Sequence, residues 1–357
     1  MTVLARFARE GRDELVSMQC DLCVPPVLSA STTVEMQKLG WLLADDGHDL
    51  DVCPGCALSV PERSRRRRGD ATPVTPDPER LPNLVVIGAA KAGSTSLHNY
   101  LDLHPEISMS HDKEVRYFTD PDCLSWVGRY QSYFPAGTRY RGESTPQYTK
   151  FPLYPGVVDR MADLTPDARL VYLVRDPVER AIAEYVEEVT WGVIGASIDE
   201  ELRDADAVHN VLVAPSRYAT QLREFHRRFD PSQILVVDLA ELAEHPAVVV
   251  ARVFDFLGLE RIDLDDEALR PRNAYGDKGA LPGWYRVFRR PALVRLAHKL
   301  PKEQLTRMQY FFTARLTKPV ERPQPTEETL ARLRAVLAPE AAELREMTGQ
   351  AFAGWSV

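Results

Sequence analysis

The 357-residue sequence lacks an apolar run of about 18 residues, the length that a membrane-spanning helix needs. It also lacks a secretory leader, because Arg6, Glu10 and Asp13 interrupt its first apolar residues. An excess of positive charge is missing too, since the formal net charge is -8. These absences predict a cytoplasmic protein without a membrane span, and they count against general nucleic-acid binding.

Cysteine is scarce as well, and four of the five cysteines fall in the first 60 residues. They form two Cys-x-x-Cys pairs, the usual way to present four thiolates to a zinc ion. The gap between the pairs is longer than usual, and a helical insert over residues 34–44 would fill it. We therefore predict a zinc-ribbon-like module over residues 1–60, with free thiols or a disulfide as alternatives, and expect it to recruit a carrier or partner protein. Its predicted Zn²⁺ ligands are Cys20, Cys23, Cys53 and Cys56.

Residues 61–80 combine a run of arginines with spaced prolines, and neither part can bury apolar surface. We interpret them as a solvated linker; binding of nucleic acid, an anionic lipid surface or an acidic carrier protein is the alternative.

Residues 81–357 alternate short apolar runs with helical patterns. The predicted strands cover residues 84–88, 107–109, 140–142, 169–174 and 233–238, and the predicted helices cover 94–103, 177–189, 215–229, 246–257 and 327–347. Alternation of this kind predicts an α/β domain with a P-loop-type three-layer fold, in which helices flank a central parallel sheet.

A glycine-rich turn, residues 88–97, joins the first strand to the first helix and is here called the glycine turn. Its backbone amides and the following helix N-terminus predict an anion site, to which Lys91 adds a full charge. An ATP-binding P-loop carries its lysine directly after the second glycine, where this chain has Ser94. We predict that a nucleotide phosphate binds here, against the alternative of an ordinary strand–helix turn. The predicted contacts are Lys91, Ala92, Gly93, Ser94, Thr95 and Ser96.

A second candidate follows the strongest predicted strand. Arg175 leaves that strand and Pro177 begins the next helix, so the guanidinium is expected at the same sheet edge as the glycine turn. The planar fork of arginine donates two hydrogen bonds to a phosphate. An isolated Arg-Asp-Pro more often begins a salt-bridged helix, but its pairing with the glycine turn favours a binding role.

Both motifs resemble those of the sulfotransferases that use 3′-phosphoadenosine 5′-phosphosulfate (PAPS), whose patterns are close to K-x-G-[ST]-[ST]-x-L and R-D-P-x-x-R-x-x-S-x-Y. Arg180 and Tyr185 also match the second pattern, whereas Ala183 replaces its serine and removes one hydroxyl donor. Residues 113–118 resemble the K-E-x-x-[FY]-F of heparan sulfate-type sulfotransferases. Looser matches occur at residues 218–222, 229–235, 255–258 and 344–355.

The resemblance implies an enzyme that transfers a sulfuryl group from PAPS to a hydroxyl, less often an amine, of a sugar, glycolipid or small molecule. It implies that Lys91 stabilises the leaving phosphate and that Glu114 is the general base. Ion pairing of Glu114 with Lys113 or Arg116 is the structural alternative. The rival base is His111.

The resemblance also assigns Lys278 and Gly279 to a loop over the 3′-phosphate. The related enzymes often have histidine at Arg116 and lysine near Ser144, and these departures concern the substrate class rather than the reaction. Two other functions remain open: a P-loop kinase or NTPase, and a zinc-containing interaction protein with a degenerate nucleotide domain.

Overall fold

The computed structural model describes residues 3–9, 12–19, 28–32, 75–190, 194, 196–265, 267–270, 279–280, 318–319 and 322–357. The chain divides into two compact units. The larger is the α/β unit, formed by Thr72–Val186, Ala196–Ala274 and Pro323–Val357.

The smaller unit contains strands that the sequence did not predict. An antiparallel sheet joins β1 (Val3–Arg9), β2 (Arg12–Gln19) and β3 (Leu28–Thr32) in that order. A second antiparallel pair joins β9 (Gly279–Ala280) to β10 (Lys318–Pro319). Gly279 is thus described only as part of a strand, and Lys278 lies outside the described residues. All four predicted zinc ligands, Cys20, Cys23, Cys53 and Cys56, also lie outside them, so the zinc module stays a prediction.

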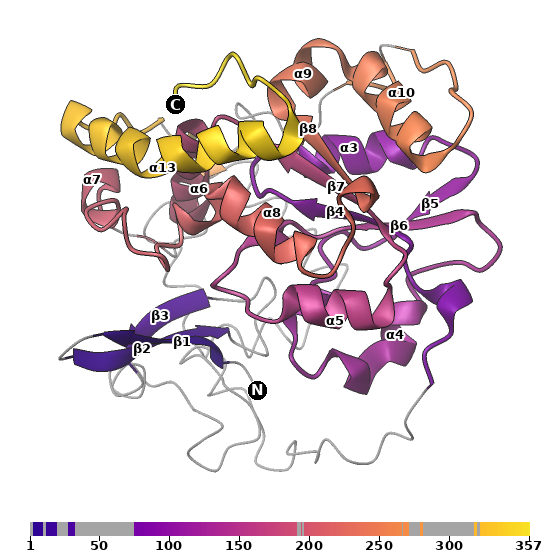
Figure 1. The fold of residues 1–357 in the computed structure, drawn as a ribbon, viewed down its shortest axis with the longest axis horizontal. Coiled ribbons are helices and arrows are strands. Elements are labelled where there is room, and N and C mark those ends of the chain that lie inside the picture. Colours follow the sequence, from indigo (N-terminus) through magenta and orange to yellow (C-terminus); the bar gives the residue numbers. More distant parts are fainter. Residues whose placement is uncertain are drawn as a thin grey trace. The chain divides into compact units, whose positions relative to one another are not determined.

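Five parallel strands form the centre of the α/β unit (Figure 1). Their order is β5 (Ile107–Met109), β6 (Tyr140–Ser144), β4 (Leu84–Gly88), β7 (Arg169–Val174) and β8 (Ile234–Asp238). All residues of β4 are buried, as expected for a strand that is covered on both faces. The predicted parallel α/β sheet is therefore confirmed.

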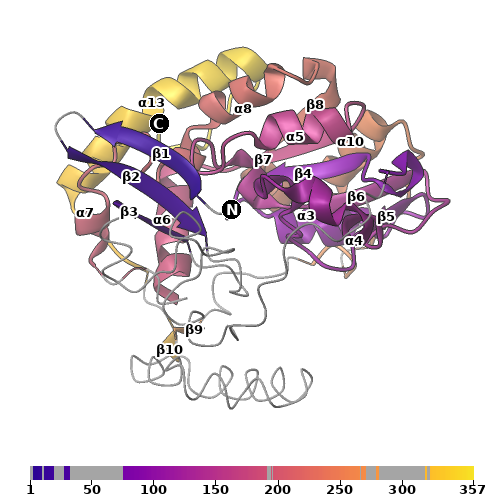
Figure 2. The same ribbon diagram turned by 90° about the horizontal axis from the view of Figure 1, so that it is seen from below.

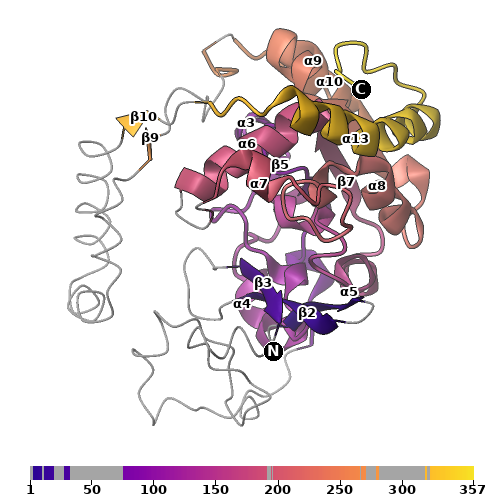
Figure 3. The same cartoon turned by 90° about the vertical axis from the view of Figure 1, so that its left-hand side faces the viewer.

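The connections through α3 (Ser94–Leu101) and α5 (Val157–Leu164) run in opposite directions across the sheet. Helix α3 leads from β4 to the edge strand β5, whereas α5 leads from β6 across β4 to β7. Because such crossovers are right-handed, opposite directions place the two helices on opposite faces of the sheet. Figures 1 and 3 show α3 on one side and α5 on the other, and Figure 2 views the sheet from the side of α5. The end of β4 is thus a switch point, where α/β proteins bind ligands.

Further helices complete the layers. These are α4 (Val127–Gln131), α6 (Pro177–Thr190), α7 (Ile198–Glu201), α8 (Tyr218–His226), α9 (Leu239–Glu244), α10 (Pro246–Leu257) and α13 (Glu327–Thr348). Short 3-10 turns occur at Pro78–Arg80, Tyr117–Thr119, Cys123–Trp126, Pro146–Thr149, Ala214–Ser216 and Pro231–Gln233. In the part of the chain that the structure describes, no helix is long and apolar enough to cross a membrane.

The structure differs from the prediction at several elements. The helix expected over residues 215–229 is a 3-10 turn followed by the shorter α8, because Arg217 between them has a non-helical backbone, with φ of −81° and ψ of 70°. Strand β6 continues two residues beyond the prediction, to Ser144. Helices α5 and α9 were not predicted, since they are short and their apolar patterns span few turns.

Candidate functional site

The glycine turn makes a tight bend at the switch point. Lys91 and Gly93 both have left-handed backbones, with φ of 65° and 89°. The Ala89 amide donates to Leu173 O of β7 at 2.6 Å, which holds the turn against the neighbouring strand. A β-carbon on Gly93 would lie 2.7 Å from Leu239 Cδ1, so a larger residue would displace the end of the Leu239 side chain and strain the left-handed backbone. The predicted turn is therefore a closely packed bend at the start of α3.

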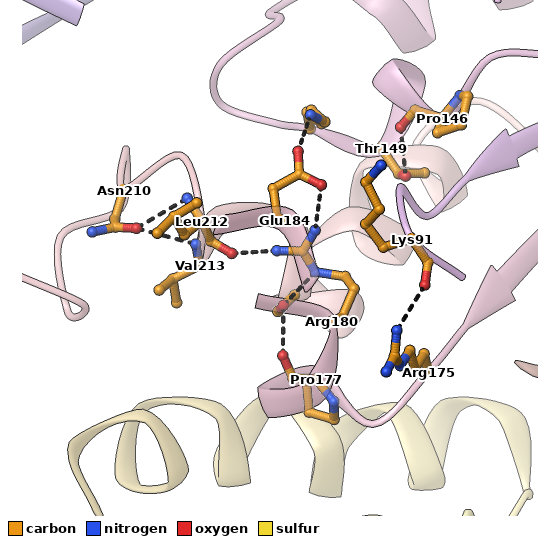
Figure 4. Close-up of polar contacts among 12 residues, drawn as sticks. Lys91, Pro146, Thr149, Arg175, Pro177, Arg180, Glu184, Asn210, Leu212 and Val213 are labelled. Carbon is orange, nitrogen blue, oxygen red and sulfur yellow. Dashed lines mark hydrogen bonds and ion pairs between the residues drawn. The ribbon is translucent and has the colours of Figure 1, made fainter. Parts of the chain in front are cut away.

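Arg175 lies beside this turn, as the sequence predicted. Its guanidinium Nη1 donates to Lys91 O at 3.4 Å, and its Nη2 donates to Glu179 Oε2 at the same distance (Figure 4). Its backbone amide donates to Tyr218 Oη at 3.3 Å. The side chain is 28% exposed, which leaves part of the guanidinium open to a ligand. The structure thus brings the two sequence motifs together at one sheet edge.

A buried charge cluster lies next to Lys91. The carboxylate of Glu184, on α6, accepts from Lys150 Nζ at 2.6 Å and from Arg180 Nη1 at 3.4 Å. Burial alone would raise the pKa of Glu184, but the positive charges of Lys150, Arg180 and Lys91 outweigh it and lower the pKa to about 2. Figure 4 shows the Lys91 side chain extending toward Thr149, on the side of the sheet edge that Glu184 occupies.

Arg180 is fully buried and connects α6 to the loop that precedes α8. Its Nη2 donates to Leu212 O, and its Nε donates to Ser216 Oγ, which in turn donates to Pro177 O at 2.8 Å (Figure 4). A fully buried guanidinium requires hydrogen-bond acceptors for its five N–H donors. Arg180, the second arginine of this motif, therefore holds α6 to the loop before α8, whereas Arg175 lies beside the glycine turn.

Glu114 lies at the same sheet edge, in the segment after β5. Its oxygens are 3.1 Å from Lys113 Nζ and 3.5 Å from Arg116 Nη2, and Gln147 Nε2 donates to it at 3.2 Å. Lys113 Nζ also donates to Ser94 Oγ at 3.5 Å, so one lysine connects this segment to the glycine turn. Glu114 and Arg116 both have positive φ, of 60° and 59°, and backbone strain of this kind is concentrated at functional sites.

The ion pairs of Glu114 lower the pKa of its carboxyl group. Partial burial would raise its pKa, but the charges of Lys113 and Arg116 and the hydrogen bonds from Lys113 and Gln147 lower it below the usual 4.5. Both ion pairs that formed the structural alternative are therefore present. The Glu114 side chain nevertheless remains 36% exposed.

The rival base, His111, is placed differently. Its side chain is 98% exposed and lies 3.3 Å from Asp112 Oδ1. His98, which belongs to no predicted motif role, is buried on α3, and its Nδ1 is 3.0 Å from Ser144 Oγ. Burial, with help from Lys113, lowers the pKa of His98 to about 4, so the ring is neutral at physiological pH.

The fully buried carboxyl group of Glu143 belongs to a hydrogen-bond network that contacts the Glu114 segment. Glu143 on β6 accepts from Tyr130 Oη, from Thr145 Oγ1 at 2.9 Å and from Tyr148 Oη at 3.0 Å. Burial raises its pKa. Thr145 Oγ1 also accepts from the Arg116 amide at 3.3 Å, so this network fixes the strained backbone beside Glu114.

The two remaining positions of the second motif also lie on α6. Ala183 is buried on α6, and Tyr185 Oη donates to Ala196 O at 2.9 Å. Within the described ranges, no group of three or more histidine, cysteine, aspartate or glutamate side chains could hold a metal ion.

Comparison with known families gives a match over part of the chain. Residues 109–263 match the model described as "Sulfotransferase family". The segment includes Glu114, Arg175 and Glu184, whereas the glycine turn precedes it.

Two relatives are similar over about half of the chain. The human "Bifunctional heparan sulfate N-deacetylase/N-sulfotransferase 2" is 27% identical over 201 residues, which are 51% of this chain and 22% of that protein. The mouse "Heparan sulfate glucosamine 3-O-sulfotransferase 6" is 30% identical over 214 residues, which are 57% of this chain and 61% of that protein. The chain therefore spans less than two thirds of either relative.

A solved structure gives the fold. The crystal structure of a sulfotransferase from Alicyclobacillus acidocaldarius covers 77% of this chain and 99% of its own, with a TM-score of 0.53 and 22% identity. At this identity, the likeness supports the shared α/β fold alone.

Proposed function

We propose that this chain is a sulfotransferase that takes a sulfuryl group from PAPS. The observation that carries the proposal is the meeting of Lys91 and Arg175 at the switch point, where Arg175 Nη1 lies 3.4 Å from Lys91 O. The family match over residues 109–263 and the two heparan sulfate relatives support the same reaction class. A kinase or NTPase is disfavoured because Ser94 stands where a P-loop needs lysine.

The chemistry requires charge compensation on the phosphate that leaves. In the proposed mechanism the amides of residues 92–96 and the start of α3 bind the 5′-phosphosulfate, and Lys91 stabilises the negative charge that grows on the leaving 5′-phosphate. Arg175 binds the 3′-phosphate with its partly exposed guanidinium. The missing hydroxyl at Ala183 leaves Arg175 with a larger share of that binding.

Glu114 is the proposed general base. Its lowered pKa keeps it ionised at neutral pH, so it is ready to accept the proton of the attacking hydroxyl or amine. The acceptor oxygen or nitrogen forms a bond to sulfur while the bond from sulfur to the 5′-phosphate oxygen breaks. Lys113, which contacts both Glu114 and Ser94, holds the base beside the glycine turn. His111 is the weaker candidate because its ring is almost fully exposed.

The acceptor we propose is a hydroxyl, or less often an amine, of a sugar, glycolipid or small molecule. Two relatives are named for N- and 3-O-sulfation of heparan sulfate, which are amine and hydroxyl acceptors of one carbohydrate. Arg116 and Ser144 depart from the pattern of those enzymes. We therefore expect a carbohydrate-type acceptor that differs from heparan sulfate.

Ligand-dependent thermal denaturation tests the proposal. A ligand that binds only the folded state raises the melting temperature. We expect adenosine 3′,5′-bisphosphate (PAP) to raise it at concentrations where ATP has little effect. A preference for ATP, or no shift with either nucleotide, would refute the sulfotransferase proposal. Transfer from PAPS to a panel of glycosides and phenols then identifies the acceptor class.

A further inference from the structure

The segment after α13, residues 350–357, returns to the sheet edge and is here called the tail segment. Gln350 Nε2 donates to Val236 O of β8 at 3.0 Å. Arg345 Nε donates to Ala351 O at 2.9 Å, and its Nη2 donates to Val357 O at 2.6 Å. The rings of Phe352 and Trp355 stack with their centroids 4.4 Å apart. The tail segment thus has a defined conformation, held by α13 and β8.

The tail segment reaches the turn that carries Arg175. The Ser356 amide donates to Asp176 Oδ2. The other carboxylate oxygen of Asp176, Oδ1, accepts from the Glu179 amide at 2.9 Å. The Trp355 ring lies 5.6 Å from the ring of Tyr218. Two side chains that contact the tail segment, Asp176 and Tyr218, therefore lie on either side of the Arg175 backbone.

Tyr218 completes the connection, because its hydroxyl accepts from the Arg175 amide at 3.3 Å. The backbone at Arg175, from which the guanidinium extends, is held by the Tyr218 hydroxyl on one side and by the capped first turn of α6 on the other. Each of these two supports rests on one residue of the tail segment, Trp355 for Tyr218 and Ser356 for Asp176.

We propose that the tail segment positions Arg175 for the 3′-phosphate of the nucleotide, with Ser356 acting through Asp176 and Trp355 acting through Tyr218. The inference rests on the proposed function, in which Arg175 binds that phosphate. Ser356 and Trp355 are positioning residues, since neither needs to touch the ligand. Their effect should therefore depend on whether the ligand carries a 3′-phosphate.

The test compares two nucleotides by isothermal titration calorimetry. PAP carries the 3′-phosphate, and adenosine 5′-monophosphate (AMP) lacks it. The variant Ser356→Pro removes the amide hydrogen that Asp176 accepts, whereas Ser356→Ala keeps that hydrogen and is the matched control. We expect Ser356→Pro to weaken PAP binding about tenfold, as for a lost charge-assisted hydrogen bond that acts indirectly, with AMP binding unchanged. The Ser356→Ala variant should bind both nucleotides as the parent protein does.

Equal weakening of PAP and AMP would show that the tail segment serves the fold alone, and it would overturn the inference. Unchanged PAP binding in Ser356→Pro would overturn it too. Should Ser356→Pro fail to fold, Trp355→Leu tests the second support, because it removes the ring that lies against Tyr218. A parent protein that binds PAP no better than AMP would refute the proposed 3′-phosphate role of Arg175 itself. The two failures are therefore distinguishable.

Discussion

Replacing Glu184 by glutamine tests the buried charge cluster. The substitution keeps the size of the side chain and removes the negative charge that pairs with Lys150 and Arg180. The pKa of Glu184 is about 2 where 4.5 is usual, a difference of roughly 2.5 units. At 1.36 kcal/mol per unit, the ionised carboxylate contributes about 3 kcal/mol to the free energy of unfolding at neutral pH. Removing one partner of a buried ion pair generally costs about 3–5 kcal/mol, which agrees.

Urea denaturation followed by circular dichroism measures this effect. Glu184→Gln should lower the urea concentration at the midpoint of unfolding without changing how steeply the free energy of unfolding depends on urea. Glu328→Gln is the matched control, because Glu328 pairs with Arg332 at 3.1 Å while 85% exposed, and solvent screens such pairs. The control should leave the midpoint unchanged.

The pH dependence of the stability difference between the parent protein and Glu184→Gln provides a second test. A carboxylate with a lowered pKa stabilises the folded state above its usual pKa of 4.5, and this stabilisation is lost as the pH falls toward 2. The difference in stability between the parent protein and Glu184→Gln should therefore be full at pH 6 and much smaller at pH 3. A difference that stays constant between these pH values, or that is absent at pH 6, would refute the assignment of Glu184 as an ionised buried partner.

Three further substitutions probe the proposed site. Lys91→Ala should abolish transfer from PAPS in a direct transfer assay, while Lys91→Arg, which keeps the charge, should retain part of it. Glu114→Gln should lower kcat and leave the Kd for PAP within about twofold, and an unchanged kcat would exclude Glu114 as the base. Because the pKa of Glu114 lies below 4.5, kcat/KM of the parent protein should decline only below that pH. Gly93→Ala should lower the urea midpoint, because a non-glycine residue in the left-handed conformation costs about 1–2 kcal/mol and the new methyl group would contact Leu239. An unchanged midpoint would contradict the packing described for the turn.

The parallel sheet could be predicted because the sequence patterns that indicate its strands are local. Strands β4 and β7 are short apolar runs followed by glycine or arginine, and the rule that parallel strands end at one edge brings Lys91 and Arg175 together. Neither inference requires knowledge of packing between distant residues.

The charge cluster and the tail contact could not be predicted in the same way. Lys150 meets Glu184 across 34 residues, and Ser356 meets Asp176 across 180. Isolated charges of this kind look like solvated surface in a sequence. A partial signal existed for Glu184, since Arg180 and Glu184 are spaced i, i+4 on a helix that begins in a recognised motif. The roles predicted for Lys91, Glu114 and Arg175 remain predictions until the variants are measured.

The full burial of Arg180 has a practical consequence for protein engineering. Because its guanidinium donates to the Leu212 carbonyl and the Ser216 hydroxyl, an insertion after Val213 would separate these acceptors and deprive a buried charged group of a hydrogen-bond partner (Figure 4). A few residues earlier the chain is open, and Val208 is 57% exposed. A fluorescent label or an affinity peptide therefore belongs next to Val208, where the chain can lengthen without disturbing the interior.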